Sequence, residues 1–373
     1  MTSEERRAAR RARRVERRAA KRAARLAGCT LEAVADPANL RRAQRQAARG
    51  VGWKASTQRY MRDWLLNLFR TRADLLAGRS VHRGFHEFDV VERGKLRHIS
   101  SVHFSERVPQ KSLAQNVLVP ALTPTLIARN TANIRGRGLS AALAGLKRDM
   151  ARHWRAHGAE GWVLLVDFRR YFDSIAHGPL KAQLEAALDD EGALRLAGAL
   201  VDLQGARGLG LGCEPNQIEA VAFPNRLDHL TCEVLRPEGY GRYMDDAYLI
   251  DADKGLLLEC LERWREEAAA LGLDLSEGKT RLVKLSKGFS WLKKRVCYSP
   301  SGRVVMRPGR ETVTRERRRL RAMATKVAAG EMAAAEMRQA FSAWAGGMRG
   351  LDARRTARST EKYMETLLEG ATS

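Results

Sequence analysis

The alternation of apolar and polar positions predicts several strands and turns. Trp162–Val166 is an unbroken apolar run, which predicts a strand buried on both faces. Residues 239–250 hold two β-prone runs around Met244-Asp245, which predicts a hairpin. Residues 85–99 predict a second hairpin that turns at residues 92–95. These runs predict one buried strand and two hairpins.

Helix-like patterns cover most of the remaining chain. Residues 30–80, 179–205 and 254–270 each predict helical structure, and residues 111–128 predict a helix interrupted near Pro120 and Pro124. Phe289, Trp291 and Leu292 alternate with polar residues, which predicts a short strand. The segment after this strand is predicted to be helical to the end of the chain.

Three carboxylates fall at the ends of these predicted strands. Asp167 follows the buried run directly, where a carboxylate is costly unless it is paired. Asp245 and Asp246 are adjacent at the hairpin turn, where they repel each other unless they are solvated or bind a cation. If the strand lies beside the hairpin, Asp167 faces Asp245 and Asp246 is close by. Such a cluster can hold two cations about 3.5–4 Å apart, which serve in-line displacement at phosphorus. A solvated Asp-Asp turn is the alternative for the dipeptide alone.

The net charge points to a polyanionic partner. The chain has 67 Lys and Arg residues against 43 Asp and Glu residues, which gives a net charge of +24. Nucleic acid is the usual partner of so basic a protein. A basic protein at a membrane surface is the alternative on charge alone. No apolar run approaches the roughly 20 residues that a membrane span needs, so no membrane partner is expected.

Residues 1–27 form a distinct basic arm. They contain ten Arg and one Lys against three Glu, and almost no large apolar residues. Such a segment is expected to be disordered alone and helical on RNA or DNA. A solvated tail is the alternative interpretation.

Cysteine and histidine positions favour neither a disulfide framework nor a zinc site. The five cysteines are scattered and form no CxxC pair, which is typical of a protein of the reducing cytoplasm. His82 and His86, like His153 and His157, have helical i,i+4 spacing. Without Cys or acidic companions, these pairs are expected to be surface or packing histidines.

Several motifs together resemble a known family. Tyr243-Met244-Asp245-Asp246, with Asp167 and the aromatic–acid pair at 172–173, resembles the catalytic core of the reverse transcriptases. Further segments resemble other motifs of that family in the same order: 96–99 with 106–110 (fingers), 208–217 (template and nucleotide loop), 271–280 (the motif after the hairpin) and 289–293 (primer grip). The resemblance extends from about residue 80 to at least 295, and more weakly to the C-terminus. Within the family, the chain is similar to the compact bacterial and prophage enzymes, which include defence-associated and diversity-generating retroelement enzymes.

The resemblance implies an α+β right-hand polymerase with fingers, an antiparallel-sheet palm and a small helical thumb. Its expected divisions are the arm at 1–27, N-terminal helices and fingers at 28–160, the palm at 161–295 and the thumb at 296–373. The implied reaction is RNA-directed DNA synthesis with two Mg²⁺ ions, for which Mn²⁺ can substitute. By resemblance, the metal ligands are Asp167, Asp245, Asp246 and the main-chain carbonyl of Phe168, and Lys279 protonates the leaving pyrophosphate.

Further site residues follow from the same motifs. The expected dNTP-binding residues are Lys95, Arg97, Arg107, Phe172, Leu211, Gly212 and Gln217. The expected primer-grip residues are Phe289, Trp291 and Leu292, and the expected nucleic-acid contacts are Arg135, Arg137, Arg310, Arg315 and Arg318. The ring of Phe172 is expected to exclude a 2′-hydroxyl. Leu211 stands where many relatives carry Gln, a replacement also found in the diversity-generating class.

The expected partners are an RNA template, above all a cognate non-coding RNA, together with the DNA product and dNTPs. The sequence leaves open whether the chain also binds a protein partner or forms a homo-oligomer. The role favoured by the resemblance is bacterial antiviral defence. The alternatives are a diversity-generating retroelement enzyme, a catalytically idle RNA-binding scaffold, and an RNA-templated RNA polymerase, which Phe172 disfavours.

Overall fold

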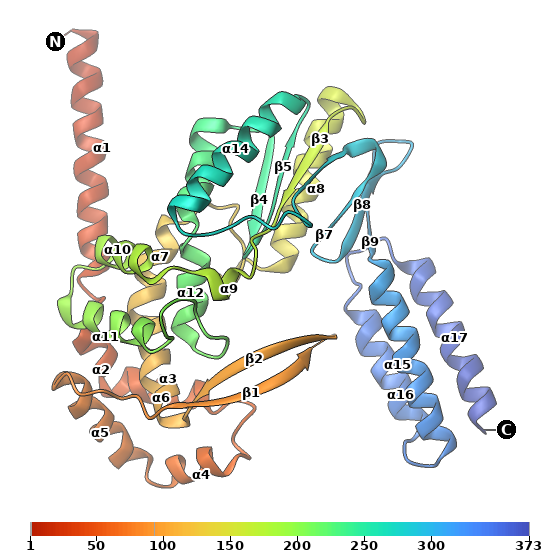
Figure 1. Ribbon diagram of the computed structural model, residues 1–373, viewed down its shortest axis with the longest axis horizontal. Helices are drawn as coiled ribbons and strands as arrows, with labels where there is room; N and C mark the ends of the chain where they lie inside the picture. Colours follow the sequence, from red (N-terminus) through yellow and green to blue (C-terminus); the bar gives the residue numbers. More distant parts are fainter. Residues whose placement is uncertain (1, 93, 373) are drawn as a thin grey trace.

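The computed structural model describes residues 2–92 and 94–372, and it combines many helices with three antiparallel sheets (Figure 1). The helices before the first strand are α1 (Ser3–Leu26), α2 (Leu31–Ala35), α3 (Pro37–Ala47), α4 (Ala55–Arg62) and α5 (Trp64–Leu76). The next group is α6 (Phe104–Leu113), the π-helical turn η1 (Ala114–Leu118), α7 (Val119–Leu122), the 3-10 turn η2 (Thr123–Thr125) and α8 (Leu139–His157). The helix expected over 111–128 changes geometry at 114–118 and again at 123–125, near Pro124, but it continues through Pro120.

The later helices surround the central sheet and form the C-terminal end. They are α9 (Tyr171–Ser174), α10 (His177–Ala187), α11 (Glu191–Asp202), α12 (Glu214–Ala222), α13 (Asn225–His229), η3 (Leu230–Leu235), α14 (Lys254–Ala270), η4 (Leu285–Lys287), α15 (Arg310–Ala328), α16 (Ala334–Gly346) and α17 (Arg354–Thr372). The prediction of one helix over 179–205 is wrong. The chain breaks between α10 and α11, because the carboxylate of Asp190 accepts a hydrogen bond from the Ala193 N–H and begins a new helix.

The central sheet confirms the expected pairing of the buried strand with the hairpin. Its strands are β3 (Trp162–Val166), β4 (Gly239–Tyr243), β5 (Asp246–Asp251) and β6 (Arg281–Lys284), in the order β4-β5-β3-β6. All neighbouring strands are antiparallel. β3 lies between β5 and β6, which explains why it is apolar throughout.

The two faces of β3 belong to two different cores. Leu164 and Val166 pack in the larger core, which also contains Trp264 of α14. Val163 and Leu165 pack in a second core together with apolar residues of α8 and of the β7–β9 sheet. α14 and α8 therefore cover opposite faces of the sheet, so that the strand ends are held from both sides.

The other two sheets are smaller. β1 (Phe85–Glu92) and β2 (Lys95–Val102) form the second expected hairpin, with Glu92 paired to Lys95. β7 (Phe289–Trp291), β8 (Lys294–Tyr298) and β9 (Val304–Pro308) form a three-stranded sheet. The prediction that the chain is helical from residue 296 is therefore wrong. Gly302, at φ +78°, lies in the turn before the β-branched pair Val304-Val305, which favours a strand.

The C-terminal helices have a core of their own. Leu320 of α15, Phe341 of α16 and Leu368 of α17 pack together in this small bundle. Figure 1 shows the bundle beside the β7–β9 sheet and apart from the N-terminal helices.

The N-terminal arm is a helix, which corrects the expectation of disorder. α1 begins with a capping box between Thr2 and Glu5, and its many Ala and Arg residues favour helix. Only its C-terminal end is docked: Leu26 is buried, and Arg22 pairs with Asp189 at 2.9 Å. The rest of α1 extends away from the body of the molecule (Figure 1). No helix within the described residues is both long and apolar enough to cross a membrane.

Candidate active site

The three aspartates meet at one end of the central sheet. Asp167 follows the last residue of β3, and Val166 pairs with Ala247 of β5. Continuing this antiparallel register places Asp167 beside Asp246. The charge of Asp167 raises the pKa of both Asp245 and Asp246, so the three acids lie close to one another.

A tight turn carries Asp245 between the two strands of the hairpin. Tyr243 pairs with Asp246, so the turn consists of Met244 and Asp245 alone. Met244 has a φ of +59°, which is rare for a residue with a side chain. Its surroundings must therefore hold this turn in place.

Burial and neighbouring carboxylates disfavour the charged forms of Asp245 and Asp246. Asp167 is only 4% exposed. Burial, followed by the charge of Asp167, raises the pKa of Asp245 above its usual range. Burial raises the pKa of Asp246 to about 7, with further contributions from Asp245 and Asp167. A cation at this site would remove that penalty by favouring the charged forms.

Lys279 is the basic group in this cluster. Its Nζ lies 2.6 Å from Oδ1 of Asp167. Burial lowers the pKa of the ammonium, but the hydrogen bond and charge of Asp167 outweigh burial, so that the pKa is raised overall. The Ser276 N–H donates to the main-chain oxygen of Asp167 at 2.7 Å, which anchors the turn that carries the lysine. The Lys279 ammonium therefore acts on the carboxylates directly, and the buried charge of Arg242 also acts on Asp245.

The main chain at Phe168 is held firmly. Phe168 forms an isolated bridge with Leu275, and the Arg169 N–H donates to the Asp274 carbonyl at 2.8 Å. The ring of Phe168 is buried and stacks between Tyr171 and Trp264, with centroid distances of 5.2 and 6.2 Å. This arrangement fixes the backbone next to Asp167.

A cavity of about 630 Å³ opens beside the acids. Its lining includes Phe172, Leu211, Asp245 and Lys279. The structure therefore brings two of the expected dNTP-binding residues next to the expected catalytic residues. His98 of β2 lines the same cavity, and it is a residue that sequence reasoning did not select.

The other expected dNTP-binding residues lie elsewhere or outside the described part. Arg107, Gly212 and Gln217 line a separate cavity of about 370 Å³. Lys95 and Arg97 belong to β2, but their side chains fall outside the described residues. Of the seven expected dNTP-binding residues, Phe172 and Leu211 therefore line the cavity at the acids, and Arg107, Gly212 and Gln217 line a different one.

The expected primer-grip aromatics face inward. Phe289 and Trp291 are buried, and the Trp291 ring meets that of Tyr248 edge-on at 4.8 Å. Leu292 and Lys293 form the two-residue turn between β7 and β8, both with positive φ. The aromatics can therefore support this turn, but they do not present a surface to a ligand.

The expected nucleic-acid contacts divide into exposed and internal residues. The exposed ones are Arg135, Arg310, Arg315 and Arg318. Arg137 instead donates to the carbonyls of Ile127 and Asn130 at 2.8 and 2.7 Å. Its guanidinium therefore stabilises the loop that contains it through hydrogen bonds within the protein.

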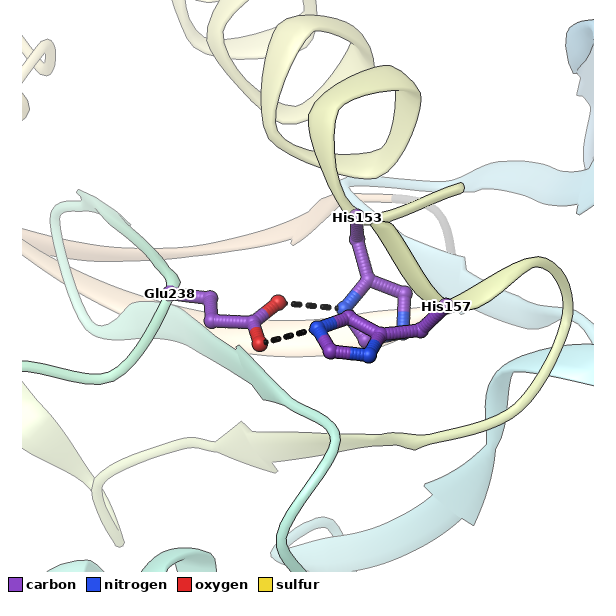
Figure 2. Close-up of side chains that lie close together, drawn as sticks. All are labelled: His153, His157 and Glu238. Atoms are coloured by element: carbon purple, nitrogen blue, oxygen red, sulfur yellow. Dashed lines mark hydrogen bonds and ion pairs between the residues drawn. The ribbon is translucent and has the colours of Figure 1, made fainter. Parts of the chain in front are cut away.

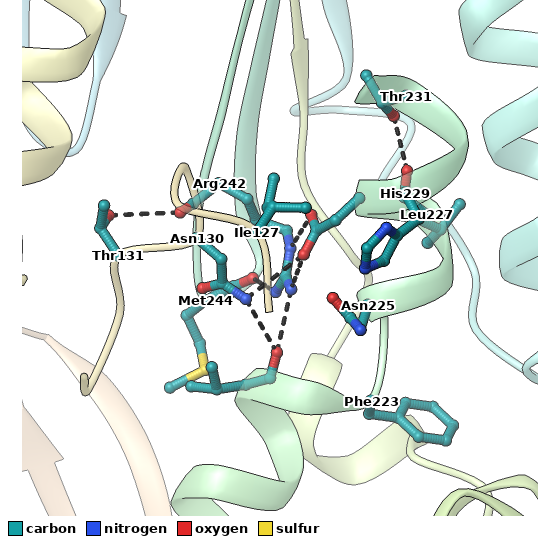
Figure 3. A network of polar contacts seen from close by, with 12 residues as sticks. Ile127, Asn130, Thr131, Phe223, Asn225, Leu227, His229, Thr231, Arg242 and Met244 are labelled. Atoms are coloured by element: carbon teal, nitrogen blue, oxygen red, sulfur yellow. Dashed lines mark hydrogen bonds and ion pairs between the residues drawn. The ribbon is translucent and has the colours of Figure 1, made fainter. Parts of the chain in front are cut away.

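Sequence reasoning missed the residues that support the catalytic turn. Arg242 of β4 is fully buried and donates to the Met244 carbonyl at 2.8 Å and to the Val221 carbonyl at 3.0 Å (Figure 3). It also pairs with the buried Asp228. The signal available in the sequence was an arginine inside an otherwise buried strand, two residues before Met244.

Comparisons with known proteins give little that bears on function. No protein-family model matches the sequence, and no curated protein is similar to it. One solved structure to which the fold is similar is telomerase from Candida albicans in complex with a TWJ fragment of telomeric RNA. The identity is 10%, the TM-score is 0.45, and the match covers 64% of this chain and 49% of the telomerase chain. This chain thus spans about half the length of that telomerase, and a likeness of this degree does not establish an activity.

Proposed function

We propose that this protein is an RNA-directed DNA polymerase that transfers nucleotides from dNTPs to a primer 3′-hydroxyl. One observation carries the proposal: Asp167, Asp245 and Asp246 converge at the end of a buried sheet, beside a cavity that Phe172 and Lys279 also line. In this proposal the sheet is the palm of a right-hand polymerase. β1–β2 and the N-terminal helices are the fingers, and α15–α17 are the thumb.

The donor set fits Mg²⁺. Carboxylate and carbonyl oxygens are hard ligands of the kind that Mg²⁺ prefers, and Mn²⁺ accepts the same ligands. Asp167, Asp245, Asp246 and the carbonyl of Phe168 would hold the ions. Burial first, and then the neighbouring carboxylates, raises the pKa of Asp245 and of Asp246, and bound cations would favour the charged forms of both. When bound, such ions activate the attacking hydroxyl and stabilise the charge on the transferred phosphoryl group.

The remaining residues act through position and proton transfer. Lys279 is held in its protonated form by Asp167, so it can give a proton to the leaving pyrophosphate. Phe172 lies in the same cavity as Asp245, which supports a role for its ring in excluding the 2′-hydroxyl of an rNTP. Leu211 offers an apolar contact near the incoming base, where many reverse transcriptases have Gln.

The template is proposed to be RNA. The net charge of +24 supports a polyanionic partner. The exposed arginines of α15 and the helix α1 are the proposed contacts to the phosphate backbone. Proteins recognise RNA-containing duplexes mostly through the phosphate backbone and the shape of the duplex, and rarely through base sequence. Exposed arginines suit contacts of this kind.

The test is primer extension on a defined RNA template. Wild-type protein with Mg²⁺ should extend a DNA primer with dNTPs, and chelation should stop the reaction reversibly. Asp167→Asn and Asp245→Asn should abolish extension while RNA binding is retained. Asp202→Asn, at an exposed ion pair with Lys181, is the matched control and should leave extension unchanged. Extension by either active-site variant would refute the proposal.

The proposed biological role is DNA synthesis for bacterial antiviral defence. Diversification of a target gene is the second candidate, because Leu211 replaces the usual Gln. In a phage-sensitive host, protection should be lost in Asp245→Asn under the first role. Under the second, the enzyme should misincorporate opposite template adenines, and Leu211→Gln should reduce those errors. Equal plaque counts with wild type and Asp245→Asn, together with strong adenine-directed mutagenesis, would reverse the preference.

A further inference from the structure

Two histidines and a glutamate converge at the opposite end of the central sheet from the aspartates. His153 and His157 lie on the last turns of α8, and Glu238 immediately precedes β4. Figure 2 shows the Glu238 carboxylate directed at both imidazole rings. The ligand atoms of all three side chains lie within 4.8 Å of one another, and the three aspartates form no such compact group among the described residues.

The distances within this group are those of direct contacts. Nδ1 of His153 lies 2.6 Å from one Glu238 oxygen, and Nε2 of His157 lies 2.7 Å from the other. The second ring nitrogen of His153, Nε2, lies 2.6 Å from the main-chain oxygen of Glu160. That carbonyl can only accept, so the Nε2 position carries a hydrogen. Nδ1 is then the nitrogen left to bind a proton or a metal ion.

This arrangement has the outer contacts that are typical of a metal site. A metal-binding histidine usually donates its other N–H to a carbonyl or carboxylate, which fixes the ring and its tautomer. The Glu160 carbonyl does this for His153. The Glu238 N–H donates to a carboxylate oxygen of Asp251 at 3.1 Å, and Arg152 donates to the Glu238 carbonyl. Hydrogen bonds therefore fix the main chain of Glu238 at both its N–H and its carbonyl.

The ring of His153 is also confined by its neighbours. The side chain is buried, and a Cβ at Gly161 would lie 2.6 Å from Nε2. Gly161 has a φ of +114°, so a residue with a side chain is disfavoured there in any case. His157 and Glu238, by contrast, are 37% and 32% exposed. The group is thus fixed on its inner side and open to solvent on its outer side.

We propose that His153, His157 and Glu238 form a binding site for a Zn²⁺ ion. Two imidazoles and a carboxylate are ligands that suit Zn²⁺ better than Mg²⁺, which prefers oxygen. The open outer side leaves room for a water molecule as a fourth ligand. The ion would join the C-terminal end of α8 to the start of β4. It would thereby brace the strand whose far end carries the turn with Asp245.

The test is zinc binding by the full chain, purified without a polyhistidine tag and stripped with a chelator that is then removed. Isothermal titration with ZnCl₂, in the absence of nucleotides, should show one equivalent bound per chain. Co²⁺ in place of Zn²⁺ should give visible absorption typical of nitrogen and oxygen ligands. Bound Zn²⁺ should also raise the melting temperature.

Matched variants identify the ligands. His157→Ala and Glu238→Gln should each lose stoichiometric binding and the rise in melting temperature. His229→Ala is the control, because His229 also contacts a carboxylate, that of Glu233, but has no second histidine in that contact. It should bind zinc as the wild type does. Asp245→Asn should also bind zinc, which separates this site from the proposed magnesium site.

Each result decides the proposal independently of DNA synthesis. Each variant is compared with its own metal-free form, so that a change in basal stability does not obscure the zinc effect. No binding by the wild type would mean that the three side chains form an ion-pair cluster only. Binding that persists in both His157→Ala and Glu238→Gln would place the zinc elsewhere, and would also overturn the proposal.

Discussion

Arg242 and Asp228 form an ion pair beneath the β4–β5 turn, with Nη2 and Oδ2 2.6 Å apart and both side chains fully buried. Burial lowers the pKa of the arginine, but the charge and hydrogen bonds of Asp228 outweigh burial and raise it overall. The guanidinium therefore stays charged. Because it also donates to the Met244 carbonyl, it holds the residue with positive φ that precedes Asp245.

Asp228→Asn should destabilise the protein strongly. The substitution keeps the size of the side chain but leaves the Arg242 charge buried without a counter-charge. Breaking a buried pair in this way costs about 3–5 kcal/mol. Urea unfolding followed by circular dichroism measures the loss.

The control for this prediction is Asp202→Asn. Asp202 pairs with Lys181 at the surface, where such pairs contribute about 1 kcal/mol or less. Equal effects of the two substitutions would mean that the buried pair has no special part in holding the hairpin.

Glu219 should make stability depend on pH. Its side chain is buried in α12, and both carboxylate oxygens lack a hydrogen-bond partner among the described residues. Burial raises its pKa from an ordinary value of 4.5 to about 8. Between these values the folded protein keeps a proton that the unfolded chain has lost, so stability falls as pH rises.

Glu219→Gln should remove this dependence. The variant should become progressively more stable than the wild type between about pH 5 and pH 8, by at most about 5 kcal/mol. Thermal unfolding across this pH range measures the difference. Glu185→Gln, on the exposed side of α10, should run parallel to the wild type. A Glu219→Gln curve parallel to the wild type would show that the carboxyl is not buried as described.

Phe172→Ala should relax the choice of sugar. Phe172 lines the cavity beside Asp245, and its ring contacts Tyr171 edge-on at 5.8 Å. Removing a steric clash with the 2′-hydroxyl should raise rNTP use relative to dNTP use by roughly 10–1000-fold. Competition between rNTPs and dNTPs in primer extension measures the ratio. If the ratio does not change, the ring serves packing alone.

Truncation of α1 should weaken RNA binding through loss of charge. At 100° per residue, the Arg and Lys residues of α1 all fall on one half of the helix, and Ala residues dominate the other half. Deleting residues 2–21 keeps the docked end at Arg22 and Leu26. The slope of log K against log salt should become shallower by roughly 0.7–0.9 for each lost phosphate contact.

The Ala-rich half provides the control for this truncation. Replacing Ala8, Ala12 and Ala19 with Gln changes that half without altering charge, so the salt slope should stay the same. An unchanged slope after truncation would show that α1 does not contact the RNA.

Local pattern alone determined much of the central sheet and its chemistry. The unbroken apolar run at Trp162–Val166 predicted a strand covered on both faces, which is β3, and the charged helix expected at 254–270 is α14, at the expected bounds. The acids at the strand ends were visible because buried strands rarely end in unpaired carboxylates. Such features depend on neighbours within a few residues, which the sequence displays directly.

Tertiary structure decided which distant residues meet. Asp228 of α13 pairs with Arg242 of β4, and Glu238 reaches His153 across 85 residues of sequence. The register that sets Asp167 beside Asp246, and the separation of Arg107 from the cavity at the acids, likewise depend on how whole elements pack. Periodicity reports which face of an element is buried. It carries no information about which side chain of another element lies opposite, because those contacts form only when the elements pack together.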